Sequence, residues 1–266
     1  MTEAKLRKAA PMGNLLWGEG SAGELNTMEK VRVVSNIAYL QVREACDAIR
    51  QRTGFLQPRP VALDDLEPPR DALVEDALGL AVQTHQEALL FHSWRVYFFG
   101  SLLAAHERIR FDRSLFFASA ILHDLGLTQG HSPDLCDCCF ALSGGRRARD
   151  YLRAKGHPAE VGKRVGDAIA LHLNAWVSKK QYGAEAHLVS RGAVCDLFGA
   201  GRRRLASETV AKLLERFPRE GAIEALRYET AKHKSGTRPA LMTALTGGKA
   251  PPDPFAHIWS SQVARN

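Results

Sequence analysis

No hydrophobic run in the 266-residue sequence is long enough to cross a membrane. A transmembrane helix needs about 18 or more consecutive apolar residues. The longest apolar stretches, around 116–122 and 168–173, are interrupted by histidine or polar residues within about two helical turns. The segment Met1–Arg7 also lacks the apolar core of a secretory signal peptide. We therefore expect a cytoplasmic protein that does not insert into a membrane.

Cysteine is scarce, and its spacing excludes a secreted disulfide framework. The chain has five cysteines, an odd number, and three of them are Cys136, Cys138 and Cys139. Small secreted domains pair an even number of cysteines. A zinc site built from cysteines needs a second pair at similar spacing, which the sequence lacks. We interpret this cluster as thiols that line a helix near a pocket.

The sequence also lacks the patterns of β-structure. Alternation of apolar and polar residues is nowhere sustained, and no Asn-Gly or Asp-Gly turn joins two β-branched runs. Apolar residues recur instead at helical spacing, between stop signals such as Gly54, Gly156 and Gly199. These patterns predict an all-α fold, a helical bundle in a single domain.

Turn signals divide the chain into three regions. Residues 1–60 hold a Gly-rich arm and then a helix, which begins with a capping-box pattern at Asn26–Glu29 and runs to about Arg52. Residues 61–235 are predicted to be successive helices, and residues 236–266 form a Pro-rich tail. We expect a loose N-terminal arm, a helical metal-binding domain and a peripheral C-terminal tail.

Basic residues outnumber acidic ones, 36 to 29, which gives a formal charge of +7. The basic runs 146–149 and 202–204 lack the interleaved aromatic residues of a single-stranded nucleic-acid surface. No Gly-rich phosphate loop, G-x-S-x-G elbow or H-E-x-x-H helix is present. We expect a small-molecule substrate and no nucleic-acid partner, and the sequence leaves a homo-oligomer open.

Four side chains suited to metal binding occur in otherwise apolar helical segments. His123 and Asp124 end one segment, His92 lies among aromatic residues in a second, and Asp196 lies in a third. A buried imidazole–carboxylate pair needs a compensating partner, and these ligand types suit Zn, Mn, Fe, Ni or Co. Taken alone, the His-Asp dipeptide could equally be a capping histidine beside a solvated carboxylate.

The order H…HD…D resembles the HD-domain metalloenzymes, a superfamily of all-α hydrolases. Over residues 60–235 the chain is similar to the cyanamide-hydratase-like branch in four segments: His92–Tyr97, Ile121–Gly126, Ala168–His172 and Glu185–Asp196. The resemblance implies that His92, His123, Asp124 and Asp196 bind one divalent metal ion per chain. One departure is Ala141, which stands where the resemblance leads us to expect an acidic residue.

A divalent ion in such a site lowers the pKa of bound water. The resemblance to the branch implies attack on a small nitrile-like (cyanamide-type) or related nitrogen-containing substrate. The wider superfamily favours a nucleotide or a phosphomonoester instead. A third hypothesis is a metal-stabilised binding or regulatory domain with little turnover, which Ala141 would suit.

Several other residues are candidates for the pocket. We expect Asp124 to orient water or relay its proton, and His172, on an apolar helix face, to hold substrate or a second metal rather than fill the core. His187 lies nine residues before Asp196, on roughly the opposite face if the helix is unbroken. We nevertheless expect it to approach the pocket from the helix start and to take a catalytic role. Arg95 is expected to pair with an acid or to clamp an anionic substrate.

The remaining histidines are assigned to the surface or to helix caps. They are His85, His106, His131, His157, His233 and His257.

Overall fold

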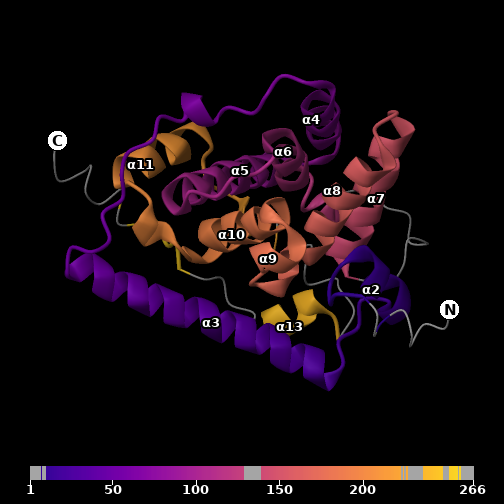
Figure 1. Cartoon of the computed structure of the whole chain (residues 1–266), viewed down its shortest axis with the longest axis horizontal. Coiled ribbons are helices and arrows are strands. Elements are labelled where there is room, and N and C mark those ends of the chain that lie inside the picture. Colours follow the sequence, from indigo (N-terminus) through magenta and orange to yellow (C-terminus); the bar gives the residue numbers. More distant parts are fainter. Residues whose placement is uncertain are drawn as a thin grey trace.

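The computed structural model describes residues 7, 10–128, 139–222, 224, 226, 236–247, 252–256 and 258. Within these ranges the regular structure is helical, apart from one isolated bridge between Glu24 and Thr237. Helices pack around a central pair (Figure 1), so the predicted all-α fold is confirmed. In the same part of the chain, no helix combines the length and apolarity that membrane spanning requires.

The central pair consists of α5 (Glu87–Glu107) and α10 (Ala184–Phe198), which cross the middle of the molecule in Figure 1. Their backbones touch, because a Cβ atom added to Gly192 would lie 2.2 Å from the carbonyl oxygen of Val96. No residue with a side chain fits at that distance, so glycine sets the closest approach of the two helices. One turn away from this contact, α5 carries His92 and α10 carries Asp196.

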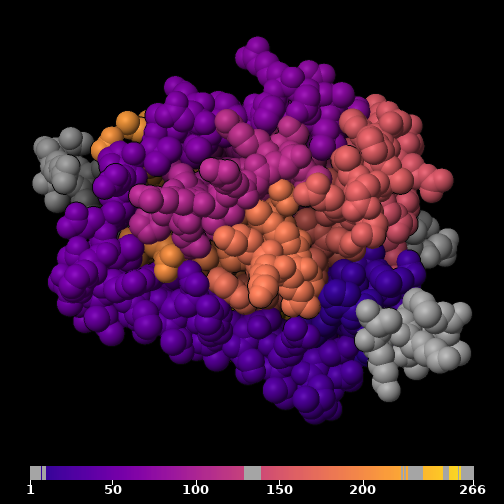
Figure 2. All heavy atoms as spheres, viewed as in Figure 1, coloured from indigo at the N-terminus to yellow at the C-terminus, as the bar shows by residue number. Residues whose placement is uncertain are grey.

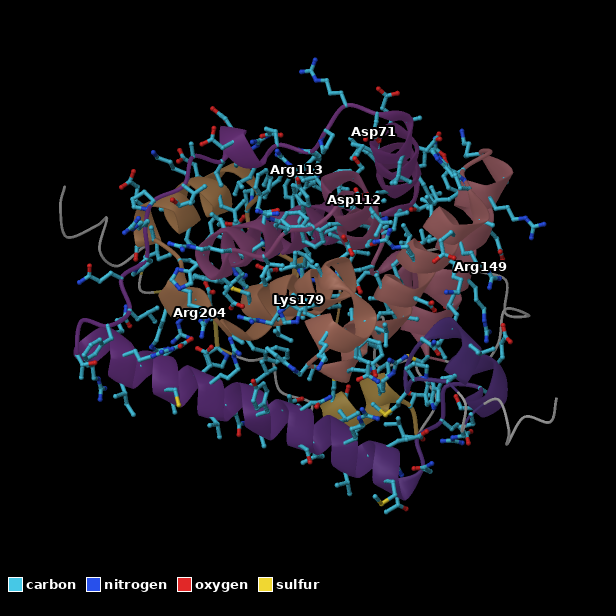
Figure 3. The ribbon with its side chains drawn as sticks, viewed as in Figure 1. Asp71, Asp112, Arg113, Arg149, Lys179 and Arg204 are labelled. Carbon is cyan, nitrogen blue, oxygen red and sulfur yellow. The ribbon has the colours of Figure 1, made fainter. Side chains whose placement is uncertain are left out.

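Further helices enclose the pair. They are α4 (Ala72–Thr84), α6 (Arg113–Ile121), α7 (Phe140–Ala154), α8 (Ala159–Leu171), α9 (Lys179–Tyr182), α11 (Ser207–Arg216) and α13 (Arg238–Leu245). Helix α6 begins at a cap formed by Asp112, whose carboxylate accepts the Leu115 backbone N–H at 3.0 Å. Asp71 caps α4 in the same way and also accepts the hydroxyl of Ser114, which ties the starts of α4 and α6 together (Figure 3).

Helix α3 (Thr27–Arg52) runs along one edge of the molecule and begins with the predicted capping box (Figure 1). Its attachment to the body is largely polar. Arg204 reaches the helix from the body (Figure 3) and binds Asp47 at 2.6 and 2.9 Å and Glu107 at 2.8 Å. Asn36 donates to the backbone carbonyl oxygen of Asn174 at 2.9 Å. The helix is therefore held at several points along its length.

In their described parts, the N-terminal arm, expected to be loose, and the C-terminal tail, expected to be peripheral, are both anchored to the body by buried side chains. In the arm, α2 (Leu15–Ser21) places Trp17 out of contact with solvent, and the indole N–H donates to Glu29 at 2.8 Å. In the tail, Arg238 is fully buried and Phe255 is 1 % exposed within the main core. One aromatic or arginine side chain anchors each segment, a feature that helical periodicity does not reveal.

Candidate metal centre

The His-Asp dipeptide lies at the end of α6, in the turn that leads into the short helix η2 (Leu125–Leu127). Within this turn, a Cβ atom on Gly126 would lie 2.0 Å from the carbonyl oxygen of Phe140. The turn is therefore pressed against the first residue of α7. His123 and Asp124 are 1 % and 2 % exposed.

Three side chains from two helices converge here. The His92 Nε2 and His123 Nε2 atoms are 3.2 Å apart. An oxygen of Asp124, Oδ2, lies 3.1 Å from His123 Nε2 and 3.5 Å from His92 Nε2. All three residues are buried, and each offers one ligand atom within 4.8 Å of the others. The structure thus brings together three of the four predicted ligands.

The Nδ1 atoms of His92 and His123 point away from the cluster and form hydrogen bonds there. These bonds determine whether Nε2, which faces the cluster, carries a hydrogen or a lone pair. His92 Nδ1 lies 2.6 Å from Asp196 Oδ2, and His123 Nδ1 lies 2.8 Å from the Ala120 carbonyl oxygen. In a neutral imidazole, the nitrogen that faces an acceptor oxygen carries the hydrogen. Both Nε2 atoms therefore point a lone pair at the same place.

The carboxylate of Asp124 adds a third electron-rich atom. Its Oδ2 is buried and has no hydrogen-bond partner among the described residues. Two lone pairs and an unpartnered anionic oxygen repel one another in a low-dielectric site unless a cation joins them. Neutral imidazoles and a carboxylate are ligands that Zn, Mn, Fe, Ni and Co accept, so the residues present fit a divalent ion.

The pKa values of His123 and Asp124 also indicate that the cluster favours a positive charge. Burial lowers the pKa of His123, but the charge and proximity of Asp124 outweigh burial and raise that pKa above its ordinary value. Burial raises the pKa of Asp124, while the neighbouring histidines, His123 foremost, bring that pKa well below its ordinary value. A proton on His123 is the competitor of a metal ion, so we expect metal binding to release protons.

Asp196 lies on the other side of the His92 ring from this cluster, which corrects its expected place among the converging ligands. Its Oδ1 and Oδ2 accept from Arg95 at 2.9 and 3.0 Å, and Arg219 donates to Oδ1 as well. Its Oδ2 also accepts the Nδ1 hydrogen of His92. Both carboxylate oxygens are thus engaged, and the α5 backbone fills the space beside Gly192.

Arg95 is fully buried against this carboxylate. Of the two roles considered for Arg95, ion pairing with an acid is therefore confirmed. Burial raises the pKa of Asp196, but the Arg95 charge and the His92 hydrogen bond overcome burial and hold that pKa far below its ordinary value. Asp196 is consequently an anion that fixes the His92 tautomer.

His172 stands beside the cluster, where the short helix η3 (His172–Asn174) follows α8. Its Nδ1 donates to the Ile169 carbonyl oxygen at 2.6 Å, so its Nε2 carries a lone pair, 3.7 Å from Asp124 Oδ1. Its ring packs edge-on against His123, with 5.0 Å between centroids. Burial lowers the pKa of His172 to about 3, which makes it a neutral imidazole at physiological pH.

His187 lies away from the cluster, contrary to the expected catalytic role. Its ring packs edge-on against Trp176 with centroids 5.1 Å apart, and its Nδ1 donates to the Val177 carbonyl oxygen at 2.6 Å. Helix α10 is unbroken, so nine residues place His187 on the face opposite Asp196. Its environment is that of a satisfied core histidine.

His85 is a buried residue that the sequence analysis assigned to the surface or to a helix cap. It does cap the end of α4, yet it is only 8 % exposed and its Nε2 has no hydrogen-bond partner in the described ranges. Burial lowers its pKa to about 4, while the charge of Asp124 acts in the opposite direction. Only its position seven residues before His92, two helical turns in an unbroken helix, could have drawn attention to it.

Two further sequence features have a place in this region. Ala141 is fully buried in α7 and supplies no carboxylate, while the neighbouring Phe140 packs its ring against His172 at 5.8 Å. Cys139 is buried and receives a hydrogen bond from Arg238 at 3.4 Å. Cys136 and Cys138 lie outside the described residues.

The segment that contains the cluster also matches a known family. Residues 89–217 match the family model of the HD domain. This segment is similar to an HD domain. HD domains are generally metal-dependent hydrolases, and all three clustered residues fall within the matched segment. Among curated proteins, none matches the sequence at a significant level.

Proposed function

We propose that the protein is a metal-dependent hydrolase or hydratase that holds one divalent ion per chain with His92 Nε2, His123 Nε2 and Asp124. The observation that supports this proposal most strongly is the buried, unpartnered Asp124 Oδ2 facing two imidazole lone pairs. Zn, Fe, Mn, Ni and Co are the candidate ions. A bound ion supplies a Lewis acid and lowers the pKa of water.

In this proposal Asp196 and Arg95 do not bind the ion; they orient the ligand His92. A carboxylate on the Nδ1 side of a ligating imidazole fixes its tautomer and orientation and raises its basicity. The Arg95 guanidinium holds the Asp196 carboxylate through two hydrogen bonds at 2.9 and 3.0 Å, so the carboxylate does not rotate towards the ion. The ligand set thus has one carboxylate, not the two expected from the sequence.

Asp124 Oδ1 and His172 Nε2 form the polar edge of the cluster, 3.7 Å apart. Both atoms accept hydrogen bonds, so together they orient a water molecule through its two O–H groups. A pKa of about 3 makes His172 too weak a base to hold a proton at pH 7. We therefore assign His172 to positioning water or substrate and Asp124 Oδ1 to orienting the water.

The His172→Ala variant is expected to lower kcat about 10–100-fold while the metal content stays unchanged, the range typical of residues that support a metal site. His187→Ala is the matched control, because His187 is also buried with its Nδ1 bonded to a backbone carbonyl oxygen at 2.6 Å. We expect that control to retain kcat once its folding is confirmed by circular dichroism. Equal losses in the two variants would show that His172 has only a packing role.

The substrate that suits this site best is a small, weakly charged molecule such as a nitrile of the cyanamide type. The Arg95 cation is occupied by Asp196, and burial keeps His85 and His172 neutral. A phosphate group would require several free cations in the same place. Addition of water to a nitrile carbon gives an amide, which for cyanamide is urea.

The substrate class is tested by incubating the metal-loaded protein with cyanamide and small nitriles, and separately with p-nitrophenyl phosphate and nucleotides. We expect amide or urea to form in the first set and no phosphate release above background in the second. Phosphate release without amide formation would reverse this assignment. A stoichiometric metal ion with no turnover in either set would instead support a binding or regulatory domain.

A phosphomonoester is the second candidate substrate because one cationic side chain, Arg147, lies in this region. Arg147 on α7 is partly buried, donates to the Thr128 hydroxyl at 3.1 Å and acts electrostatically on His85. If the substrate is a nitrile, Arg147→Met should change kcat/KM for cyanamide by less than about threefold, because no charge pairs with the guanidinium in the reaction.

For a phosphomonoester substrate, the same variant would lose about 100-fold in kcat/KM, the size expected for a charge-assisted contact worth 1.5–3 kcal/mol. The matched control is Arg153→Met, an exposed arginine on the same helix. We expect that control to be inert for either substrate.

A further inference from the structure

Helix α3 has an inner face that serves the monomer. Val33, Leu40 and Asp47 recur every seven residues and are buried against the body. The same side of the helix carries Asn36, bonded to the body, and the Arg204 contacts described above. The inner face alone therefore attaches α3 to the body, and no residue of the opposite face is needed for this attachment.

The opposite face of α3 carries a stripe that is apolar except for one serine. At alternating spacings of three and four, its residues are Met28, Val31, Ser35, Ala38, Val42, Ala45 and Ile49, all exposed. The large members Met28, Val31, Val42 and Ile49 are 75, 53, 61 and 62 % exposed. A repeat of this kind, 3.5 residues on average, is the seam of a two-helix coiled coil.

The stripe lies on the outside of the molecule. Figure 2 shows α3 as a continuous ridge along one edge in the space-filling view. The helix has 26 residues, so the ridge is about 39 Å long at 1.5 Å per residue. Contiguous apolar surface of this extent on a folded protein marks an interaction site. The stripe lies outside residues 89–217, so it is not part of the matched HD segment.

The pattern of side-chain sizes fits a second α3 helix in antiparallel orientation. If two copies meet with their Leu40 positions level, the seam layers pair Val31 with Ile49 and Ser35 with Ala45. The next layer pairs Ala38 with Val42. Bulky residues thus meet near the ends, and small residues let the helices approach closely nearer the middle. A single face complementary to itself is what a two-fold dimer requires.

Charge on this face also selects antiparallel pairing. Arg52 is the next position of the seam after Ile49. The seam and the positions directly beside it on the helix surface contain no carboxylate, and Arg32 and Arg52 are their only charged residues. Parallel pairing in register would place the two Arg52 side chains opposite each other and align the helix dipoles. Antiparallel pairing sets Arg52 opposite Met28 of the other copy and opposes the two dipoles. The like-charge contact is then absent.

We propose that the protein forms a homodimer through the outer face of α3, paired antiparallel with α3 of a second copy. About fourteen seam and flanking residues per copy take part, fewer than the 20–30 per side of a standard interface. The dimer should therefore dissociate in the micromolar range. This proposal is independent of the metal centre, which lies under other helices.

Sedimentation velocity over about 1 to 200 μM, a range that brackets micromolar dissociation constants, tests the proposal. We expect the wild-type protein to shift from monomer to dimer within this range. Val42→Glu should raise the dissociation constant more than about tenfold, because it places a charge inside the seam. Gln51→Glu adds the same charge to an exposed position of the helix outside the seam and should leave the constant unchanged.

Disulfide trapping tests the orientation. In a Cys46→Ser background, which removes the exposed native cysteine of α3, Ser35→Cys combined with Ala45→Cys should cross-link two copies under mild oxidation, whereas Ser35→Cys alone should not. Cross-linking by the single variant would indicate parallel pairing and overturn the orientation. A wild-type protein that is monomeric throughout, or an unchanged dissociation constant in a Val42→Glu protein with native circular dichroism, would overturn the dimer itself.

Discussion

The Asp124→Ala variant is expected to lose its metal ion and at least about a thousandfold in kcat/KM, equal to roughly 4 kcal/mol of transition-state stabilisation. The substitution removes the only carboxylate of the cluster and leaves two neutral imidazoles 3.2 Å apart. Two neutral nitrogens compete poorly with water for a divalent ion. Metal content by plasma mass spectrometry and initial rates with cyanamide measure the two effects.

The control for this variant is Asp112→Ala, which removes the carboxylate that caps the same helix, α6. We expect that control to lower the free energy of unfolding by about 1 kcal/mol, the usual contribution of an N-cap, and to keep its metal. Loss of metal in both variants would trace the effect to helix α6 as a whole. Full metal occupancy in Asp124→Ala would exclude Asp124 as a ligand.

The Asp196→Ala variant is expected to lower the free energy of unfolding by about 3–5 kcal/mol, the cost of removing one partner from a buried ion pair. Arg95 is fully buried, and without Asp196 its charge keeps only hydrogen bonds to the backbone carbonyl oxygens of Phe217 and Pro218. Metal affinity should fall as well, by about 10–100-fold, because His92 loses the group that fixes its tautomer. Urea denaturation and metal titration provide the two measurements.

The two effects together distinguish an orienting residue from a ligand. Asp196→Asn retains a hydrogen-bond acceptor for His92 and Arg95, so its metal affinity should lie between those of the wild type and Asp196→Ala. If Asp196→Ala instead lost its metal completely while its stability remained that of the wild type, Asp196 would be a ligand.

Much of the fold could be predicted from local patterns. The capping box at Asn26–Glu29 and the cap at Asp112 mark true helix starts because capping depends only on neighbouring residues. Trp17 and Arg238 could not be assigned to the interior, because their burial depends on contacts with residues far away in the sequence. Arg238, for example, donates to the Ala170 carbonyl oxygen.

The candidate site could be predicted only in part for a similar reason. His92, His123 and Asp124 are unusual in apolar helices, and a buried polar group in such a segment indicates a partner. Asp196 is equally unusual, but sequence does not show which nitrogen of His92 it faces. The position of His187, in contrast, could be predicted from the sequence, because the helical angle between His187 and Asp196 places His187 on the opposite face of the helix.

His85 and the stripe on α3 show two further limits of sequence analysis. His85 stands between polar residues, so its burial near the cluster depends on how the end of α4 packs. Met28 and Val31 recur at helical spacing whether they pack inside a monomer or between two copies. Only the structure, which leaves them exposed, separates these cases.

Anomalous diffraction at the absorption edge of the bound metal tests the central claim most directly. Crystals of the metal-loaded protein should show one peak per chain, within about 2.0–2.2 Å of His92 Nε2, His123 Nε2 and an Asp124 oxygen. Asp196 should remain paired with Arg95. A peak coordinated by Asp196, a peak elsewhere in the chain, or no peak in crystals grown with the metal would contradict the account.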